Sequence, residues 1–166
     1  MIKKSILIFS LLALVLFLAC ERDDICAEST PTTPQLVIQF FDADNISDSK
    51  PINLDLIEVE REDTLFFTGD TLIRIPLKTN TESTQFRFTK NRGIDATAEE
   101  PENEDIITFN YTTNEVYISR ACGFKVTYDD LSLINTNGPD GRWIEDITIN
   151  SESILDENTT HVSIYH

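Results

Sequence analysis

The amino-acid sequence predicts an all-β protein, an antiparallel two-sheet β-sandwich of immunoglobulin-like or related type, with a β-barrel as the competing architecture. Short runs of β-branched and aromatic residues alternate with polar residues along most of the chain. Turn-forming residues separate these runs, and no stretch of about twelve residues places apolar side chains at helical spacing between capped ends. We therefore expect about eight to ten short strands.

The predicted strands of the first half are short. Leu36–Phe41 is rich in β-forming residues and lies between Pro34 and the turn residues Asp42–Asn45. Further strands are expected at Leu54–Val59, Leu65–Phe67, Ile73–Leu77 and Gln85–Phe88. Pro76 has no amide hydrogen, so the strand that contains it should lie at a sheet edge.

The second half interrupts this alternation once. Asn91–Asp105 is rich in Glu and Asp and its few apolar residues have no period, so we expect a long acidic loop there. Alternation returns at Ile107–Tyr111. Thr112–Asn114 is expected to turn the chain into a strand at Val116–Ile118.

The next predicted strand, Cys122–Tyr128, should be central, because one of its faces carries Cys122 together with Phe124, Val126 and Tyr128. Asp129–Ile134 is compatible with one helical turn. The last strands are expected around residues 147–149 and 162–164, and Trp143 is predicted to be a core residue rather than a ligand stacker.

The first twenty residues have the layout of an export signal. Lys3 and Lys4 form a basic head, Ile6–Leu18 is apolar apart from Ser10, and Ala19 places a small residue before a cysteine. As a helix the apolar run would cover about 20 Å, which is too short for a hydrocarbon core of about 30 Å. The segment is therefore interpreted as a cleaved signal rather than a membrane span.

The end of this signal resembles a bacterial lipoprotein signal, because Phe17-Leu18-Ala19-Cys20 stands where the lipobox would be. The resemblance implies that residues 1–19 are removed and that Cys20 is the lipidation site, with a diacylglyceryl group on its thiol and fatty acids such as palmitate. A further acyl group on the new amino terminus would give two or three anchoring chains, whereas a single chain binds membranes only marginally.

The cysteine count agrees with a lipidated Cys20. The chain has three cysteines, and once Cys20 carries lipid, Cys26 and Cys122 can pair in an oxidising envelope. Such a bridge would close a loop of roughly 100 residues, which the chain-entropy model values at about 4–5 kcal/mol. We predict this disulfide, and two unpaired buried thiols are the alternative.

Residues 20–34 are predicted to form a lipidated tether to a single β-sandwich domain at residues 35–166. The Ser, Thr and Pro residues of Ser29–Pro34 disfavour helix. Glu21–Asp24 resembles the export tag that directs some lipoproteins of the Bacteroidetes type to the outer face of the outer membrane. A solvated linker is an equal alternative.

The composition limits which classes of partner the protein is expected to bind. The formal net charge of −16 becomes −18 when cleavage removes Lys3 and Lys4. This charge argues against nucleic acids and anionic membrane surfaces and favours solubility or a basic partner. The mature part, Cys20–His166, is long enough for one domain with its own core, and we expect a monomer.

Several segments together resemble an uncharacterised lipoprotein family of flavobacteria and their relatives, domain of unknown function 6452. They are the leader, the Cys26 segment before Thr33–Ile38, Val116–Lys125 and the final His161–Tyr165. The resemblance spans nearly the whole chain and is most specific at Ser119–Lys125. It implies an envelope location and assigns no activity, cofactor or site.

The sequence offers no recognisable catalytic or metal-binding motif, and we predict no catalytic residue, metal site or cofactor. The only histidines are His161 and His166, and neither Gly-x-Ser-x-Gly nor a phosphate-binding glycine loop occurs. Arg120 is expected to pair with a carboxylate at a sheet edge, and an oxidised Cys122 cannot act as a nucleophile. Asp42–Asp48 offers calcium-type ligands without the glycine and final glutamate of an EF-hand, so we expect an ordinary turn.

Two functional hypotheses remain, and the sequence favours the first. It is a noncatalytic module anchored in the cell envelope, at the periplasmic or external face of the outer membrane, that binds an envelope protein or a glycan or supports a larger assembly. The second is an envelope enzyme with paired carboxylates, such as a glycan hydrolase. It requires two carboxylates about 5–10 Å apart in a cleft, and the 29 acidic residues do not locate such a pair.

Overall fold

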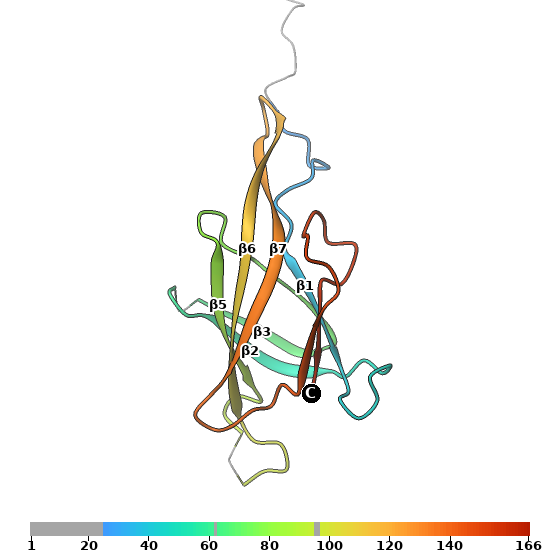
Figure 1. Ribbon diagram of the computed structural model, residues 1–166, viewed down its shortest axis with the longest axis vertical. Coiled ribbons are helices and arrows are strands. Elements are labelled where there is room, and N and C mark those ends of the chain that lie inside the picture. Colours follow the sequence, from blue (N-terminus) through green and yellow to red (C-terminus); the bar gives the residue numbers. More distant parts are fainter. Residues whose placement is uncertain (1–24, 62, 95–96) are drawn as a thin grey trace, which may run out of the picture. The chain divides into compact units, whose positions relative to one another are not determined.

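The computed structural model describes residues 25–61, 63–94 and 97–166, and within these ranges the chain forms strands and loops without a helix (Figure 1). The predicted signal and the proposed lipidation site Cys20 lie outside the described residues. The nine strands within these ranges are β1 (Leu36–Phe41), β2 (Ile52–Glu58), β3 (Thr64–Asp70), β4 (Leu72–Ile75), β5 (Ser83–Lys90), β6 (Asn103–Ser119), β7 (Gly123–Asn137), β8 (Asp146–Ile149) and β9 (Val162–Tyr165). The all-β prediction is confirmed.

The strands form two sheets of a β-sandwich. One sheet has the order β4-β1-β9-β8 and the other the order β3-β2-β5-β6-β7. As predicted from Pro76, the strand directly before it, β4, lies at a sheet edge. The expectation of purely antiparallel sheets needs one correction, because β1 and β9 run parallel, with Ile38 opposite Val162. Strand direction depends on how distant segments pair, and the alternation of residues carries no information about it.

One hydrophobic core lies between the two sheets. Successive side chains of a strand point to opposite faces, and the alternating residues of β2, β5 and β6 therefore give each strand one buried face. The core side chains of these strands are Ile52, Leu54, Leu56, Phe86, Phe88, Ile107, Phe109 and Tyr111. The facing sheet contributes Leu36, Ile38, Phe40, Ile73, Ile75, Val162 and Ile164. Trp143 is only 8% exposed, which confirms its predicted place in the core.

Two local predictions about β6 and β7 are wrong. Thr112–Asn114 does not turn the chain, and Asp129–Ile134 is not helical, because both segments lie inside long strands. Their polar side chains bind one another instead. Thr112 Oγ1 donates to Asp130 Oδ2 at 3.3 Å, and Asn114 Nδ2 donates to Asp129 Oδ2 at 2.7 Å. Residues that favour turns in isolation are thus held extended by partners on the neighbouring strand.

The predicted acidic loop ends earlier than expected, because β6 already begins at Asn103. Asp105, the last residue assigned to the loop, is fully buried. Its Oδ2 accepts hydrogen bonds from the amides of Trp143 and Ile144, at 3.1 and 2.9 Å. A buried carboxylate needs such donors to offset its lost hydration. The partners lie 38 and 39 residues away in sequence, so the local acidic composition could not reveal this role.

The described residues divide into two compact units by their contacts. One consists of residues 25–30 together with Tyr117–Phe124, which includes the end of β6, the start of β7 and the turn between them. The other consists of residues 31–116 and 125–166 and contains the sandwich core. The first unit, referred to below as the tip unit, contains the bonded cysteines.

Candidate functional site

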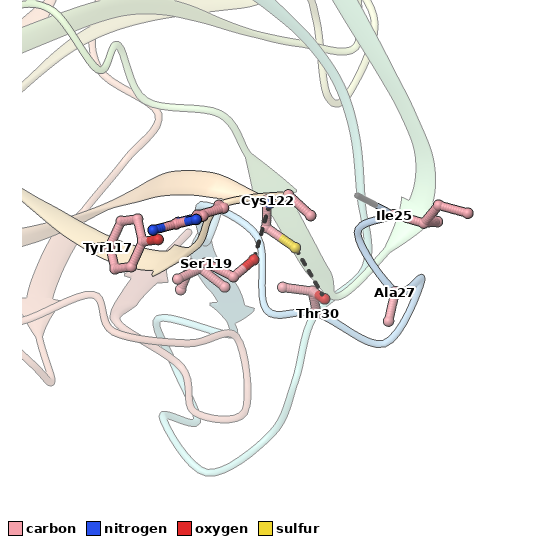
Figure 2. A pocket seen from close by; sticks show the side chains of 9 residues that line it. Ile25, Ala27, Thr30, Tyr117, Ser119 and Cys122 are labelled. Carbon is pink, nitrogen blue, oxygen red and sulfur yellow. Dashed lines mark hydrogen bonds between the residues drawn. The ribbon is translucent and has the colours of Figure 1, made fainter. Parts of the chain in front are cut away.

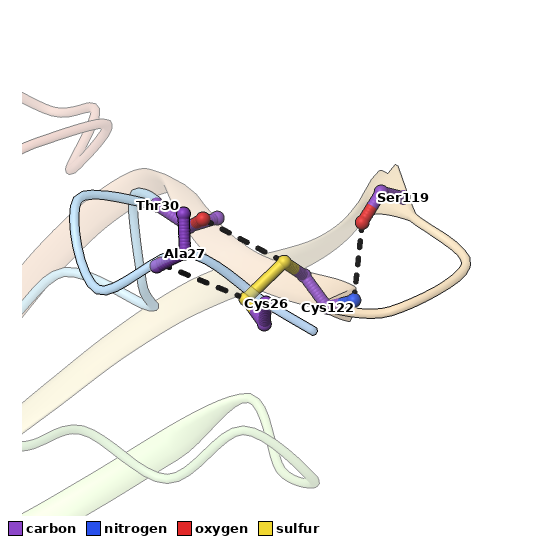
Figure 3. Close-up of a disulfide and its surroundings, with 5 residues drawn as sticks. All are labelled: Cys26, Ala27, Thr30, Ser119 and Cys122. Atoms are coloured by element: carbon purple, nitrogen blue, oxygen red, sulfur yellow. Dashed lines mark hydrogen bonds between the residues drawn. A yellow bond between two sulfur atoms is a disulfide. The ribbon is translucent and has the colours of Figure 1, made fainter. Parts of the chain in front are cut away.

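A disulfide joins Cys26 to Cys122 within the tip unit (Figure 3). The two Cα atoms lie 4.9 Å apart, inside the range of ordinary disulfides. This confirms the pairing predicted from the cysteine count. The bond fixes the segment that follows the predicted lipidation site to the turn between β6 and β7.

The turn that carries Cys122 is formed by local interactions. The amide of Cys122 donates to Ser119 Oγ at 3.1 Å. Gly123 then adopts a φ of +70°, a backbone conformation that glycine tolerates better than residues with a side chain. On the other side of the bridge, the amide of Thr30 donates to the carbonyl of Ala27 at 2.9 Å, and the Thr30 hydroxyl lies 3.6 Å from Cys122 Sγ. Both halves of the tip unit are therefore internally hydrogen-bonded beside the disulfide.

An open pocket of about 480 Å³ lies in the tip unit. Figure 2 shows Ile25 and Tyr117 on opposite sides of it, with Thr30 and Cys122 between them. The lining residues are Ile25, Ala27, Thr30 and the run from Tyr117 to Cys122. Aliphatic and aromatic groups thus surround the pocket together with the hydroxyls of Thr30 and Ser119 and the single guanidinium of Arg120.

Three large apolar side chains of the tip unit are exposed. The exposed fractions are 79% for Ile25, 56% for Tyr117 and 63% for Phe124. The rings of Tyr117 and Phe124 pack edge to face, with centroids 5.3 Å apart. The prediction that Phe124 lies on a buried central face is therefore wrong, whereas Tyr128, on the same face in sequence, is fully buried. The alternation is the same at both residues, but only Tyr128 has core residues opposite it.

Arg120 does not behave as predicted. It is exposed, and it forms no ion pair with any carboxylate in the described ranges. Its own half of the tip unit offers it none nearby in sequence, since Tyr117–Phe124 contains no acidic residue. Its guanidinium is available to a ligand with acceptor oxygens.

The two histidines are structural groups of the larger unit. His161 Nδ1 accepts a hydrogen bond from the amide of Val37 at 3.0 Å, and burial lowers the pKa of His161. The His166 ring packs edge-on against Phe40 and Trp143, at centroid distances of 6.0 and 5.7 Å. Both of its ring nitrogens are buried without a hydrogen-bond partner in the described part of the chain.

Burial of His166 makes stability depend on pH in a defined direction. Burial, followed by the nearby charges of Lys90 and Lys50, lowers the pKa of His166 to about 4. Below pH 6.5 the unfolded chain binds a proton that the folded chain does not. The free energy of unfolding therefore falls as the pH is lowered from 6.5 towards 4. His166 accounts for a loss of about 3 kcal/mol over this interval, and for none above pH 6.5. Urea unfolding of the wild type and of His166→Phe should give a stability difference that shifts in favour of the variant over this interval.

That comparison separates His166 from the many carboxylates that also titrate in acid. Asp, Glu and His161 are common to both proteins, so their contributions cancel in the difference. If the free energies of unfolding of the two proteins changed with pH in parallel, burial of His166 would not be the cause of the predicted acid destabilisation.

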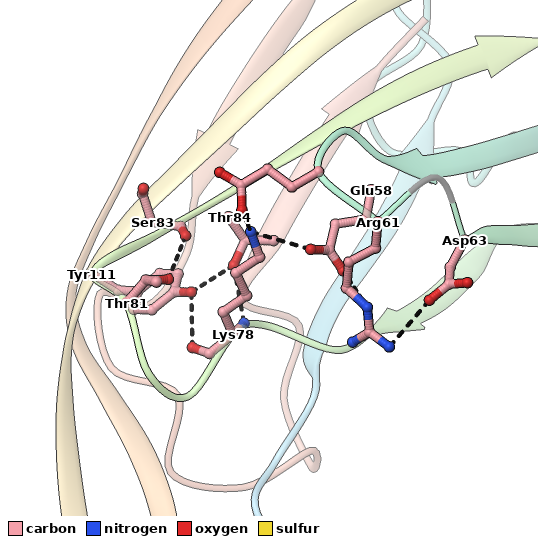
Figure 4. A network of polar contacts seen from close by, with 9 residues as sticks. Glu58, Arg61, Asp63, Lys78, Thr81, Ser83, Thr84 and Tyr111 are labelled. Atoms are coloured by element: carbon pink, nitrogen blue, oxygen red, sulfur yellow. Dashed lines mark hydrogen bonds and ion pairs between the residues drawn. The ribbon is translucent and has the colours of Figure 1, made fainter.

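A polar network centred on Lys78 crosslinks the larger unit (Figure 4). Lys78 Nζ lies 3.2 Å from Glu58 Oε1 and also pairs with Glu60. The Tyr111 hydroxyl donates to the Lys78 carbonyl at 2.9 Å and contacts Thr84 Oγ1 at 2.5 Å. Hydrogen bonding to Glu60 is the main cause that raises the pKa of Lys78. Lys78 therefore stays protonated, which suits a crosslink and not a base or nucleophile.

Two carboxylates line the same hollow elsewhere in the larger unit. Glu82 and Asp130 line a hollow of about 420 Å³ together with Tyr111 and Thr112. Asp130 Oδ2 already accepts the Thr112 hydroxyl, and Asp130 has a φ of +55°, which Asp tolerates better than most residues. This pocket is the place where a carboxylate mechanism can be tested.

The Asp42–Asp48 segment forms a turn closed by its own side chains. Asp42 Oδ1 accepts the Asp44 amide at 3.0 Å, and Asn45 Nδ2 donates to Asp48 Oδ2 at 2.7 Å. No group of three or more His, Cys, Asp or Glu residues in ranges 25–61, 63–94 and 97–166 has a metal-binding arrangement. Those ranges also hold no helix with the length and hydropathy of a membrane span.

Comparison with known proteins identifies a family but no activity. The sequence pattern of a family of unknown function, DUF6452, matches residues 53–166. The matched region includes Cys122 and the whole Tyr117–Phe124 segment. No curated protein and no solved structure matches the chain.

Proposed function

We propose that this chain, which belongs to the DUF6452 family of unknown function, is a lipid-anchored lipoprotein of the bacterial cell envelope that acts as a noncatalytic binding or structural module. Cys20 carries the lipid, and residues 20–34 tether the β-sandwich to the membrane. The proposed site is the outer membrane, at its periplasmic or external face. The proposed partner is another envelope protein or a glycan.

The observation that carries this proposal is the Cys26–Cys122 disulfide. A stable disulfide is typical of exported proteins, because cytosolic reductants keep thiols reduced. It also uses two of the three cysteines in the sequence. Cys20, at the end of the export signal, remains as the cysteine that an acyl group would modify.

The noncatalytic part of the proposal is supported by how polar groups are used. Two side chains with possible catalytic chemistry have structural partners, since Cys122 is bonded to Cys26 and His161 accepts a hydrogen bond from the Val37 amide. Lys78 is neutralised by two glutamates. In contrast, Ile25 and the Tyr117–Phe124 ring pair of the tip unit leave large apolar side chains exposed, which is typical of an interaction surface.

Metabolic labelling tests the anchor. The full chain is expressed in a diderm bacterium supplied with labelled palmitate, beside Cys20→Ala and the double variant Cys26→Ser/Cys122→Ser. We expect label in the wild type and in the double variant, and none in Cys20→Ala. Mass spectrometry of the mature protein should place the new N-terminus and the acyl groups on residue 20.

Other outcomes would overturn the proposal. An unlabelled wild-type protein, or label retained in Cys20→Ala, excludes the assigned anchor. The wild type could also hydrolyse envelope glycans and lose this activity in Glu82→Gln or Asp130→Asn. That result would favour the hypothesis of a carboxylate enzyme over that of a noncatalytic module.

A further inference from the structure

The tip unit differs from the rest of the chain in charge. The protein has a formal net charge of −16, yet the described residues of the tip unit contain one acidic residue, Glu28, and one basic residue, Arg120. A strongly acidic surface is repelled by the phosphate-rich face of a membrane. The described residues of the tip unit carry no net formal charge and are not subject to this repulsion.

The exposed side chains of the tip unit suit the boundary between water and lipid. The Tyr117–Phe124 ring pair and Ile25 expose apolar surface, and Tyr117 adds a hydroxyl that can stay hydrated. Aromatic residues with one apolar and one polar end favour the headgroup level of a bilayer. Arg120, exposed and without an ion-pair partner in the described ranges, can reach phosphate oxygens from the same unit.

Chain length limits the distance between this unit and the lipid anchor. Five residue steps separate Cys20 from Ile25, and an extended chain covers at most about 3.6 Å per residue, or about 18 Å in all. The disulfide at Cys26 then ties the same segment to the β6–β7 turn. If acyl chains on Cys20 enter the bilayer, the tip unit cannot leave its vicinity.

We propose that the tip unit rests on the phospholipid headgroup layer, with Tyr117 and Phe124 inserted at the boundary with the acyl chains and Arg120 on lipid phosphates. This inference rests on the proposed lipid anchor at Cys20 and adds a second, protein-mediated contact with the same membrane. The anchor supplies the affinity, and the tip unit adds contacts of its own side chains beside the anchor.

Fluorescence quenching tests the contact, because the sequence contains a single tryptophan, the buried Trp143. The lipidated full chain is purified and reconstituted in phosphatidylcholine vesicles with bromine on the upper acyl chain. Tyr117→Trp adds a probe to the tip unit. The matched control, Phe66→Trp, adds a probe at a residue of β3 that is 70% exposed. We expect bromolipid to quench the added emission of Tyr117→Trp and shift it to shorter wavelength, and to leave wild type and Phe66→Trp unchanged.

Two further variants complete the test. One provides a second probe in case Tyr117→Trp does not fold, and the other tests whether Arg120 contacts lipid phosphates. Phe124→Trp gives a second probe on the neighbouring strand and should be quenched like Tyr117→Trp. In the Tyr117→Trp background, Arg120→Glu should reduce the quenching, because a carboxylate would then face lipid phosphates. Circular dichroism of each variant checks that the fold is retained.

The outcomes distinguish this inference from the anchor on which it rests. If the wild-type chain carries no lipid and does not float with vesicles, the anchor itself fails. If the chain floats but both tip probes are quenched no more than Phe66→Trp, the anchor stands and the contact is overturned. The emission of the tip probes could instead shift with rising protein concentration in the absence of vesicles. The tip unit would then bind a second copy of the chain, and the proposed membrane contact would be overturned.

Discussion

Replacing both Cys26 and Cys122 with serine is expected to lower the free energy of unfolding by about 4–5 kcal/mol, because the bond closes a loop between residues 96 apart in sequence. The bond restricts the unfolded chain far more than the folded one, in which the strands between the two cysteines are already ordered. In a domain of this size the loss corresponds to a drop in melting temperature of about 10–15 °C. Urea and thermal unfolding under non-reducing conditions measure both quantities.

Reduction provides the matched control for the disulfide prediction. Dithiothreitol should lower the stability of the wild type to that of the double serine variant and leave the variant itself unchanged. Cys20→Ser should match the wild type, because Cys20 takes no part in the bond. Equal stability of wild type and double variant would contradict the prediction.

Replacing Trp143 with alanine should destabilise the protein by about 3–5 kcal/mol, the usual cost of removing a large buried aromatic side chain. The ring packs against His166, and its Nε1–H donates to the carbonyl of Phe88 at 3.1 Å. Alanine would leave both a cavity and a buried carbonyl without its donor. Chemical denaturation followed by circular dichroism measures the change, since the fluorescence of the single tryptophan is lost with the substitution.

Trp143→Phe separates the two causes. It keeps most of the buried ring but removes the donor, so a smaller loss of about 1–2 kcal/mol is expected. A tryptophan that served to stack a ligand would be exposed and dispensable for folding. Unchanged stability of Trp143→Ala would therefore contradict the core assignment.

Much of the fold could be predicted because the sandwich interior is encoded locally. Phe86 and Phe88 in β5, like Ile107 and Phe109 in β6, alternate with polar residues, and all four are buried as the alternation predicts. The edge position of β4 followed from the missing amide of Pro76. These signals need only the two-residue period of a strand and the chemistry of one residue.

The errors occur where a residue's partner is distant in sequence. Thr112 and Asn114 have turn-forming side chains, but Asp130 and Asp129 on the neighbouring strand hold them extended. Asp105 belongs to an acidic run by composition, and the amides of Trp143 and Ile144 make it a buried acceptor. No window of local sequence contains both members of such a pair.

The sequence predicted the disulfide of the candidate site but not its exposed aromatic pair. Cys26 and Cys122 were predicted to pair once Cys20 was assigned to the lipid, but the alternation placed Phe124 in the core. The exposed Tyr117–Phe124 pair was therefore missed. Two signals were present, namely the glycine after Cys122 and the lack of acidic residues from Tyr117 to Phe124 in a highly acidic chain. They show where the segment turns and how it is charged, but not whether other side chains cover it.

By itself the sequence determined the β class and the buried face of most strands, since these depend on residue type and spacing along one chain. The Cys26–Cys122 pairing was predicted on the premise that Cys20 carries lipid, and the structure shows the bond. Tertiary structure alone decided the parallel pairing of β1 with β9 and the exposure of Tyr117 and Phe124. Both depend on which distant segments lie opposite each other. A strand has the same alternating pattern whether its apolar face meets a second sheet or solvent.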